Sequence, residues 1–494
     1  MKTFKLRYIH CLVFFAVLAP QLSCKKEFLE IVPKGQQIAT ATKDYRQILN
    51  MNFLSQNNAS VYMGDEVTAL KPFVNEHTLR TQRLFRYADR IYEADQLPEE
   101  VSSEEGYIRR LYVFNKIINE VMDSQGGSEM EKKAILAEAK AGRAISNFLF
   151  LTDFTTPYNP ATAATELGIP ELTKADVTVT DFKRQSKIES YEQIIKDLTA
   201  AIPDLGPLEH RWKISRLAAH FYLARIHMAM QNFEGAKEQL DAAFTEIPKS
   251  TIPLGLYDYN KVLDPNADES WFPMLLGLFL MGFPQPADNI QTIYSIQVYA
   301  VSYVGGNANA YLLSPATISL FDPQDKRPNL FDPMEYNGSA AFPLGMRHPV
   351  GFGTPVGPSL PDLYLMRAEC RARANDLAGA IADVEVLRAQ RSGAPKVPQA
   401  AAASKETLVK YILDERIREF AFTGLRWLDM RRLSVDPVFH DHIRYTHEVH
   451  SIEDVNNDGV AGDVVESHQL DPKRFALKFG ERMLRESKGL EENP

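Results

Sequence analysis

The sequence predicts a mostly α-helical protein in which pairs of helices form a scaffold and an irregular, loop-rich part is inserted between them. Over long stretches apolar residues recur at helical spacing; Leu217, Phe221, Ala224 and Met228, for example, share one face. Between about 249 and 360 this spacing fades, and Pro, Gly, Asn and aromatic residues become frequent. A chain of 494 residues is long enough to bury a large core.

The N-terminus has the features of a secretory signal. Lys2, Lys5 and Arg7 precede an apolar run at 11–19, which is too short to span a bilayer as a helix. A polar stretch follows directly after Cys24. We therefore predict that residues 1–23 are a signal peptide that is removed, and they take no part in the fold.

Cys24 stands where bacterial lipoproteins carry their acylated cysteine. Several acyl chains on one residue give a stable membrane anchor, which a single chain does not. The preceding Gln21-Leu22-Ser23 is a loose version of the usual recognition sequence, so an ordinary secreted protein is the alternative. No A-x-A-like cleavage site competes nearby, and we predict lipidation at Cys24. The polar residues 24–43 then form a flexible leader, and 44–494 form one domain.

Charge and cysteine content exclude several classes. The net charge of −9 becomes about −12 once the three basic side chains of the signal are lost, and there is no basic block, so nucleic acid is not a predicted partner. Of three cysteines, Cys11 leaves with the signal, Cys24 is acylated, and Cys370 remains alone as a small apolar residue. No disulfide framework is possible, so the fold depends on its core.

Amphipathic helices are predicted in order along the first half of the chain. The first begins at a capping residue, Asp44. Residues 55–100 follow no clear pattern, and 155–186 are rich in Pro, Thr and Gly, as loops are. The further helices are predicted at 108–121, 130–153 and 187–202, the last starting near Ser186.

Residues 214–248 resemble a tetratricopeptide unit, two antiparallel helices in a frame of about 34 residues. Small residues allow the two helices to approach and large ones fill the groove between them. A weaker copy lies at 363–391, and one long helix is predicted at about 405–431. The residues that fit the frame are Leu223, Ala224, Phe233, Ala236, Ala243 and Pro248 in the first copy, and Ala368, Leu377 and Ala380 in the second.

The segment LDERIREFAFTGLRWLDMRRL, residues 413–433, resembles the hallmark of the SusD/RagB family of nutrient-binding outer-membrane lipoproteins. Other family-like stretches lie at 24–35, 137–150, 190–198, 312–327 and 363–370, and the chain ends in EENP. These stretches follow the family's order over nearly the whole chain. The hallmark positions that match are Glu415, Arg416, Glu419, Phe420, Gly424, Arg426, Trp427, Asp429 and Arg431.

The resemblance implies a tetratricopeptide-like α/α superhelix packed against a loop-rich ligand-binding part. It implies a protein that is not an enzyme and lies on the cell surface of a Gram-negative bacterium, lipid-anchored to the outer membrane. It also implies a partner, a SusC-like TonB-dependent transporter, to which a captured oligosaccharide or peptide is passed. Two other functions stay open: a glycan hydrolase that uses a carboxylate pair, and a tetratricopeptide adaptor that binds only proteins.

Ligand-binding residues are sought among aromatic side chains of the irregular parts, because flat rings suit the apolar faces of sugars and Asn, Asp or Arg side chains suit their hydroxyls. For any one ring, burial in the core is the alternative. The residues we predict are Trp271, Tyr294 and Tyr303 in the insertion, and Tyr62, Asp65 and Arg80 in the earlier irregular part.

The charged residues of the hallmark have a simpler explanation than catalysis. At helical spacing they form ion pairs and caps, and Arg426 beside Trp427 is expected to join its helix to a neighbour by bidentate hydrogen bonds and ring packing.

No cofactor is predicted, although residues 454–463 (DVNNDGVAGD) resemble a calcium-binding loop. The twelfth position holds Val465 in place of the bidentate Glu, so a solvated turn is the alternative. A histidine cluster at 440–450 matches no zinc-site spacing. The candidate calcium ligands are Asp454, Asn456, Asp458 and Asp463.

Overall fold

The computed structural model describes residues 39–51, 54–56, 59–71, 73–92, 106–271, 284–298, 309–335, 338, 340–350 and 357–494. Cys24, most of the predicted leader and Tyr303 lie outside these residues. Within them, no helix combines the length and the apolar character needed to cross a bilayer.

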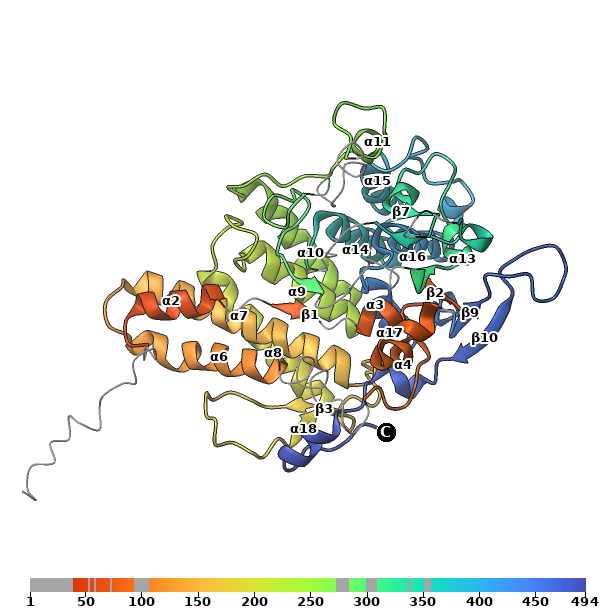
Figure 1. Cartoon of the computed structure of the whole chain (residues 1–494). Helices are drawn as coiled ribbons and strands as arrows, with labels where there is room; N and C mark the ends of the chain where they lie inside the picture. Colours follow the sequence, from red (N-terminus) through yellow and green to blue (C-terminus); the bar gives the residue numbers. More distant parts are fainter. Residues whose placement is uncertain are drawn as a thin grey trace, which may run out of the picture.

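A row of helices, each packed on the next, forms the scaffold, with α2, α6 and α7 at one end and α14 to α16 at the other (Figure 1). Helix α10 packs on α14 directly, so the two predicted repeats meet although the insertion separates them in sequence. The mostly helical fold class is confirmed. The helices are α2 (Thr42–Met51), α6 (Gly106–Glu120), α7 (Glu129–Phe154), α8 (Lys187–Ala201), α9 (Arg216–Ala229), α10 (Phe233–Glu246), α14 (Leu360–Arg373), α15 (Leu377–Arg388), α16 (Lys405–Phe420) and α17 (Leu425–Leu433).

The two repeats turn in the same way. Gln231 and Asn375 take the left-handed backbone conformation, with φ of 62° and 67°. The next residue, Asn232 or Asp376, caps the second helix and accepts the N–H of a glycine three residues on, at 2.9 and 3.0 Å. A Cβ on either glycine would meet the capping side chain at under 3.0 Å. The similarity of the repeats therefore extends to their turns.

Two helix boundaries differ from the sequence prediction. Helix α2 begins at Thr42, and Asp44 lies in its first turn, where its carboxylate accepts the N–H groups of Thr40 and Ala41. The single helix predicted at 405–431 is wrong: α16 ends at Phe420 and α17 begins at Leu425. Phe422 and Gly424 between them have φ of 61° and 80°, which no helix accommodates.

A four-stranded sheet connects the insertion and the C-terminal part to the short helices α3 (Ala59–Met63) and α4 (Leu79–Phe85). Its central strand β2 (Val67–Leu70) pairs antiparallel with β6 (Tyr311–Leu313) and parallel with β9 (Thr446–His450), which pairs with β10 (Val464–Gln469). The remaining elements are β1 (Ser55–Gln56), β3 (Leu167–Pro170), β4 (Arg184–Ser186), β5 (Gln297–Val298), β7 (Phe331–Asp332), β8 (His348–Pro349), α11 (Tyr259–Val262), α13 (Pro315–Ile318) and α18 (Glu481–Glu486).

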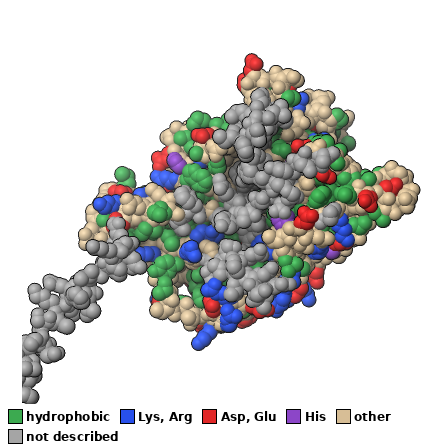
Figure 2. All heavy atoms as spheres, viewed as in Figure 1, with side chains coloured by type: hydrophobic (Ala, Val, Ile, Leu, Met, Phe, Trp, Pro, Cys, Tyr) green, Lys and Arg blue, Asp and Glu red, His purple; other side chains and the backbone are tan. Residues whose placement is uncertain are grey.

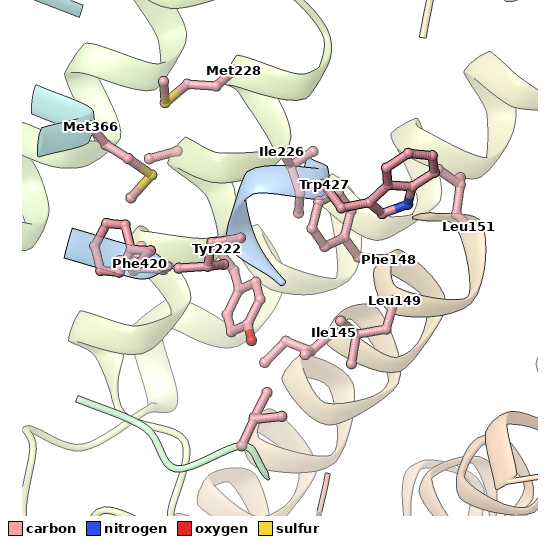
Figure 3. Packing of buried hydrophobic residues seen from close by; sticks show 14 of the residues in the cluster. Ile145, Phe148, Leu149, Leu151, Tyr222, Ile226, Met228, Met366, Phe420 and Trp427 are labelled. Atoms are coloured by element: carbon pink, nitrogen blue, oxygen red, sulfur yellow. The ribbon is translucent and has the colours of Figure 1, made fainter. Parts of the chain in front are cut away.

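One hydrophobic core runs through scaffold and sheet, with members from Ala39 to Leu490. Figure 3 shows its centre, where side chains of α7, α9, α14 and the hallmark segment meet, among them Phe148, Tyr222 and Trp427. Cys370 is 1 % exposed, and burial raises the pKa of its thiol, so it behaves as the small apolar residue that was predicted.

One methyl group added in the turn between α16 and α17 should destabilise the protein strongly. A Cβ at Gly424 would lie 2.4 Å from Ser60 Oγ and 3.2 Å from the Ser60 carbonyl carbon, in a backbone conformation that L-residues disfavour. We expect Gly424→Ala to lower the free energy of unfolding by about 2 kcal/mol or more, measured by urea denaturation.

Gly206→Ala is the matched control, because its Cβ would meet nothing within 4 Å. There the change should stay within about 1 kcal/mol. Equal losses in the two variants would contradict the assignment of strain and close contact to Gly424.

Candidate functional site

The hallmark carboxylate Glu415 on α16 is surrounded by arginines. Arg327, Arg388 and Arg418 approach its oxygens at 2.8, 2.9 and 2.7 Å. Glu415 is completely buried, and these guanidinium groups hold its pKa well below its usual range, against the effect of burial. Both its oxygens lie within 3 Å of arginines of the protein, so it is a structural residue.

A second network joins α17 to the scaffold. Asp429 accepts from Arg416 at 2.7 Å and from Arg432 at 2.9 Å. Arg416 also reaches Asp362 on α14, at 2.6 Å, and Arg432 reaches Glu369 on the same helix. The structural interpretation of the hallmark charges is therefore confirmed.

Arg426 extends this network to the sheet. Its Nε and Nη2 donate to the two oxygens of Asp65 at 2.6 and 2.8 Å, and the Arg444 amide donates to Asp65 Oδ2 at 2.8 Å. The predicted bidentate join is confirmed, with Asp65, just before β2, as the partner. Trp427 packs on Phe475 with ring centroids 4.9 Å apart. Asp65, predicted as a ligand-binding residue, is 3 % exposed, and its oxygens already hold protein donors.

Glu66 is the next residue after Asp65, and its pKa is shifted in the opposite direction. It is 0 % exposed, and neither carboxyl oxygen has a hydrogen-bond partner among the described residues. Burial, and then the charge of Asp65, raise its pKa to about 8; the nearby Phe422 amide offsets only part of this. Adjacent carboxyls with diverging pKa values are typical of acid–base catalysis. Here Arg426 binds the Asp65 carboxylate and the Glu66 side chain folds against Gly64, so neither carboxyl is open to a substrate.

An aromatic cluster lies next to these carboxyls, and we take it as the candidate binding site. Tyr62 of α3 has its ring centroid 5.0 Å from that of Tyr311 on β6, and His77, just before α4, lies 5.9 and 5.2 Å from the two. Strand pairing of β2 with β6 brings Tyr311 here across a sequence separation of more than two hundred residues.

Two polar atoms in this cluster lack a partner. Tyr311 Oη and His77 Nε2 are buried and make no hydrogen bond with the described residues. A buried polar group without a partner costs free energy, and a ligand or water that pairs with it recovers that cost. Tyr311 is one of the aromatic residues of the insertion among which ligand-binding residues are sought, but it is not one of those selected from the sequence, and His77 is not considered there. The register of β6 against β2 is what brings Tyr311 beside Tyr62.

Arg80 also lies close to Tyr62. Its guanidinium carbon is 5.7 Å from the centroid of the Tyr92 ring. Burial raises the pKa of Tyr62 well above its usual value, while the charge of Arg80 acts in the opposite direction. Of the residues predicted from sequence, Tyr62 and Arg80 are thus brought together.

The two other predicted residues that the structure describes lie apart from this cluster. Tyr294 is 4 % exposed and makes no ring contact with Tyr62, His77 or Tyr311, although it belongs to the same main core as the two tyrosines. Trp271 packs edge-on against Tyr257 and Tyr259, with centroids 5.2 and 5.9 Å away, in a separate small hydrophobic cluster. For Tyr62 and Tyr294, burial agrees with the alternative that these rings are part of the core.

The calcium-like loop joins β9 to β10 and projects from the molecule (Figure 1), with acidic side chains on its surface (Figure 2). Asp463 accepts the backbone N–H groups of Val455 and Asn456, and Asp454 accepts those of Asp458 and Gly459. The side chains thus bond to their own loop. In the described part of the chain, no group of three or more His, Cys, Asp and Glu residues is placed to hold a metal ion.

A groove of about 720 Å³ lies on the helical scaffold, where α10 begins, α14 ends and α16 begins. Arg373 is sandwiched there between the rings of Phe233 and Phe439, with its guanidinium carbon 3.9 and 4.6 Å from their centroids. Val438 beside it is 52 % exposed. None of the predicted ligand-binding residues that the structure describes lines this groove.

A helical scaffold joined by the hallmark charge network to a small sheet defines the class of this protein, and known protein families and structures show the same class. The model of the SusD family matches residues 360–488, and a model described as "Starch-binding associating with outer membrane" matches residues 27–228. A search of curated proteins gave no match.

Solved structures of similar proteins share the fold over almost their whole length. A SusD superfamily protein from Bacteroides thetaiotaomicron aligns with a TM-score of 0.67 and 16 % identity, covering 92 % of this chain and 100 % of that one. One from Bacteroides vulgatus aligns with a TM-score of 0.67 and 18 % identity, covering 92 % of this chain and 99 % of that one. A SusD-like carbohydrate binding protein from Bacteroides vulgatus aligns with a TM-score of 0.63 and 14 % identity, covering 91 % of this chain and 97 % of that one. The chain belongs to the SusD/RagB family.

Glu66 predicts a pH dependence of stability. Its pKa is about 8 in the folded protein and near 4.5 when unfolded, so the folded state binds the proton more tightly. The resulting contribution to the free energy of unfolding is fully present below pH 4.5. That contribution declines as pH rises and is lost above pH 8. We expect the unfolding free energy of the wild type, relative to Glu66→Gln, to fall by about 1 kcal/mol per pH unit between pH 5 and 8.

Urea denaturation of both proteins across this range measures the difference. Glu129→Gln serves as control, because the pKa of the exposed Glu129 is lowered by Lys133 and the side chain stays ionised over the whole range. A flat difference between wild type and Glu66→Gln would show that the buried carboxyl ionises normally.

Proposed function

We propose that this protein is a cell-surface binding lipoprotein that captures an oligosaccharide and delivers it to a SusC-like TonB-dependent transporter in the outer membrane. Family membership supports the binding role, and the description of the model matched at 27–228 supports starch-like glycans and the outer membrane. One solved relative of the same fold is described as carbohydrate binding. A peptide is the alternative ligand.

The observation that carries the proposal is the cluster of Tyr62, His77 and Tyr311. The rings of Tyr62 and Tyr311 are 2 % and 4 % exposed and belong to the main core. What the cluster offers a ligand is therefore the Tyr311 hydroxyl and the His77 imidazole nitrogen, which have no partner among the described residues. A sugar presents a rim of hydroxyls, which can pair with such polar atoms.

The same geometry argues against a hydrolase. Among the described residues, the adjacent carboxyls of Asp65 and Glu66 beside the cluster are both buried, and Arg426 binds that of Asp65. A glycosidase needs two carboxyls on either side of the scissile bond, both in contact with the substrate. We therefore expect saturable glycan binding without turnover.

The first test measures glycan binding by calorimetry after a glycan-array screen. Tyr311→Phe removes only a hydroxyl, and one that has no internal partner, so the unfolding free energy should stay within about 1 kcal/mol of wild type. Loss of a hydrogen bond to the ligand should weaken glycan affinity about tenfold.

Trp271→Phe is the matched control, because Trp271 belongs to a separate cluster, and its affinity should remain within about twofold of wild type. Unchanged affinity in Tyr311→Phe with lower affinity in Trp271→Phe would move the site to the Trp271 cluster. Release of shortened glycans by the wild type would establish the hydrolase.

The membrane anchor is tested separately through Cys24. Cys24→Ala should move the protein from the membrane fraction to the soluble fraction, because the acyl chains supply the attachment. Protease treatment of intact cells should remove the wild-type protein from the surface. Protection from protease would favour the periplasmic adaptor.

A further inference from the structure

A small cavity lies behind the hallmark helix. Its volume is about 40 Å³, enough for a few water molecules or a monatomic ion. It lies in the core region of Figure 3, where Met228 of α9 and Met366 of α14 lie close to α17. The wall residues that matter here are Tyr158, Tyr191, Asp429, Arg431 and Arg432.

The charges around the cavity almost balance. Four buried carboxylates, those of Asp362, Glu369, Asp429 and Asp436, pair with four guanidinium groups at 3 Å or less. Asp429 is the carboxylate in the cavity wall, and both its oxygens are held by arginines. The four arginines of this set are Arg225, Arg373, Arg416 and Arg432.

Arg431 is the cation left over. Its Nη1 and Nη2 donate to the carbonyl oxygens of Phe475 and Thr155, which are neutral acceptors. No carboxylate of the described residues forms an ion pair with it, although it is only 6 % exposed. Burial lowers its pKa to about 10, although Tyr191 and the buried carboxyl of Asp153, which forms no ion pair with Arg431, act in the opposite direction.

Two hydroxyl donors face the same space. Tyr158 and Tyr191 line the cavity with ring centroids 4.9 Å apart, and neither hydroxyl makes a hydrogen bond with a described residue. Tyr191 is 3 % exposed as a residue, but neither hydroxyl oxygen is fully buried, so both face space that a water molecule or a small ion can enter. Arg431 acts electrostatically on the Tyr191 phenol, which places the charge and a donor close together.

We propose that this cavity binds a small monovalent anion of halide size, chloride in the cell's surroundings. The anion balances the charge of Arg431 and accepts hydrogen bonds from the Tyr158 and Tyr191 hydroxyls. A buried cation with a nearby counter-ion costs far less than one without. The ion is structural, because it completes the core between α8, α9 and α17 and lies apart from the Tyr62, His77 and Tyr311 cluster.

The test is the melting temperature in sodium gluconate at constant ionic strength, with gluconate replaced stepwise by chloride or bromide. We expect a saturable rise of about 2 °C for the wild type, because an anion that binds only the folded state stabilises it. In Tyr158→Phe/Tyr191→Phe the rise should need at least tenfold more halide, and in Arg431→Met it should vanish.

Tyr257→Phe, far from the cavity, is the control and should keep the wild-type dependence. Anomalous scattering from a crystal grown with bromide locates the ion directly. Bromide in the cavity supports the proposal. The proposal is overturned if the wild-type melting temperature does not change when halide replaces gluconate and the cavity holds only water. Both measurements use the wild type, so they decide the matter even if Arg431→Met fails to fold. Because no readout involves glycan, this result is independent of the proposed function.

Discussion

The structure depends on a set of buried arginine–carboxylate pairs centred on α16 and α17. Glu415, Arg416, Arg426 and Asp429 are all nearly inaccessible to solvent, and their partners come from elements far apart in the sequence. A buried ion pair adds little net stability over an apolar contact, but removal of one partner costs about 3–5 kcal/mol. The network therefore acts mainly as a constraint on which elements can meet.

The link between Arg426 and Asp65 is the part of this network that bears on function. It fixes the start of β2 against α17, and β2 in turn pairs with β6 and β9. The pairing of β2 with β6 brings Tyr311 to Tyr62 and His77, which lie on the segments before and after β2. The loop-rich region is thus joined to the helical scaffold by this charged contact together with the hydrophobic core that both share. Glu66, buried without a partner beside the contact, is a local cost of that arrangement.

The helices could be predicted from sequence because their signals are local. Apolar spacing, capping residues such as Ser186 and the Asn232 and Asp376 turns each act within a few residues. The hallmark segment was correctly interpreted as structural, because charges at helical spacing on an apolar helix need buried partners.

The break at Phe422–Gly424 was missed, because positive φ leaves no mark in periodicity. The role of Asp65 was missed for a different reason. An acidic residue in an irregular segment has the same sequence signal whether it binds a ligand or an arginine 361 residues away. The place of Tyr311 beside Tyr62 depends on strand register, which no local pattern in this chain specifies. The candidate site could therefore be predicted only in part, through Tyr62 and Arg80.

If the contact between Asp65 and Arg426 positions the binding site, the two residues are coupled in folding, and a double-mutant cycle measures this coupling. Asp65→Asn, Arg426→Gln and the double variant would be compared for unfolding free energy and for glycan affinity. We predict a coupling energy of about 2–3 kcal/mol in folding, with loss of glycan affinity in each folded single variant. Additive effects on stability, with wild-type affinity in all three proteins, would contradict the account.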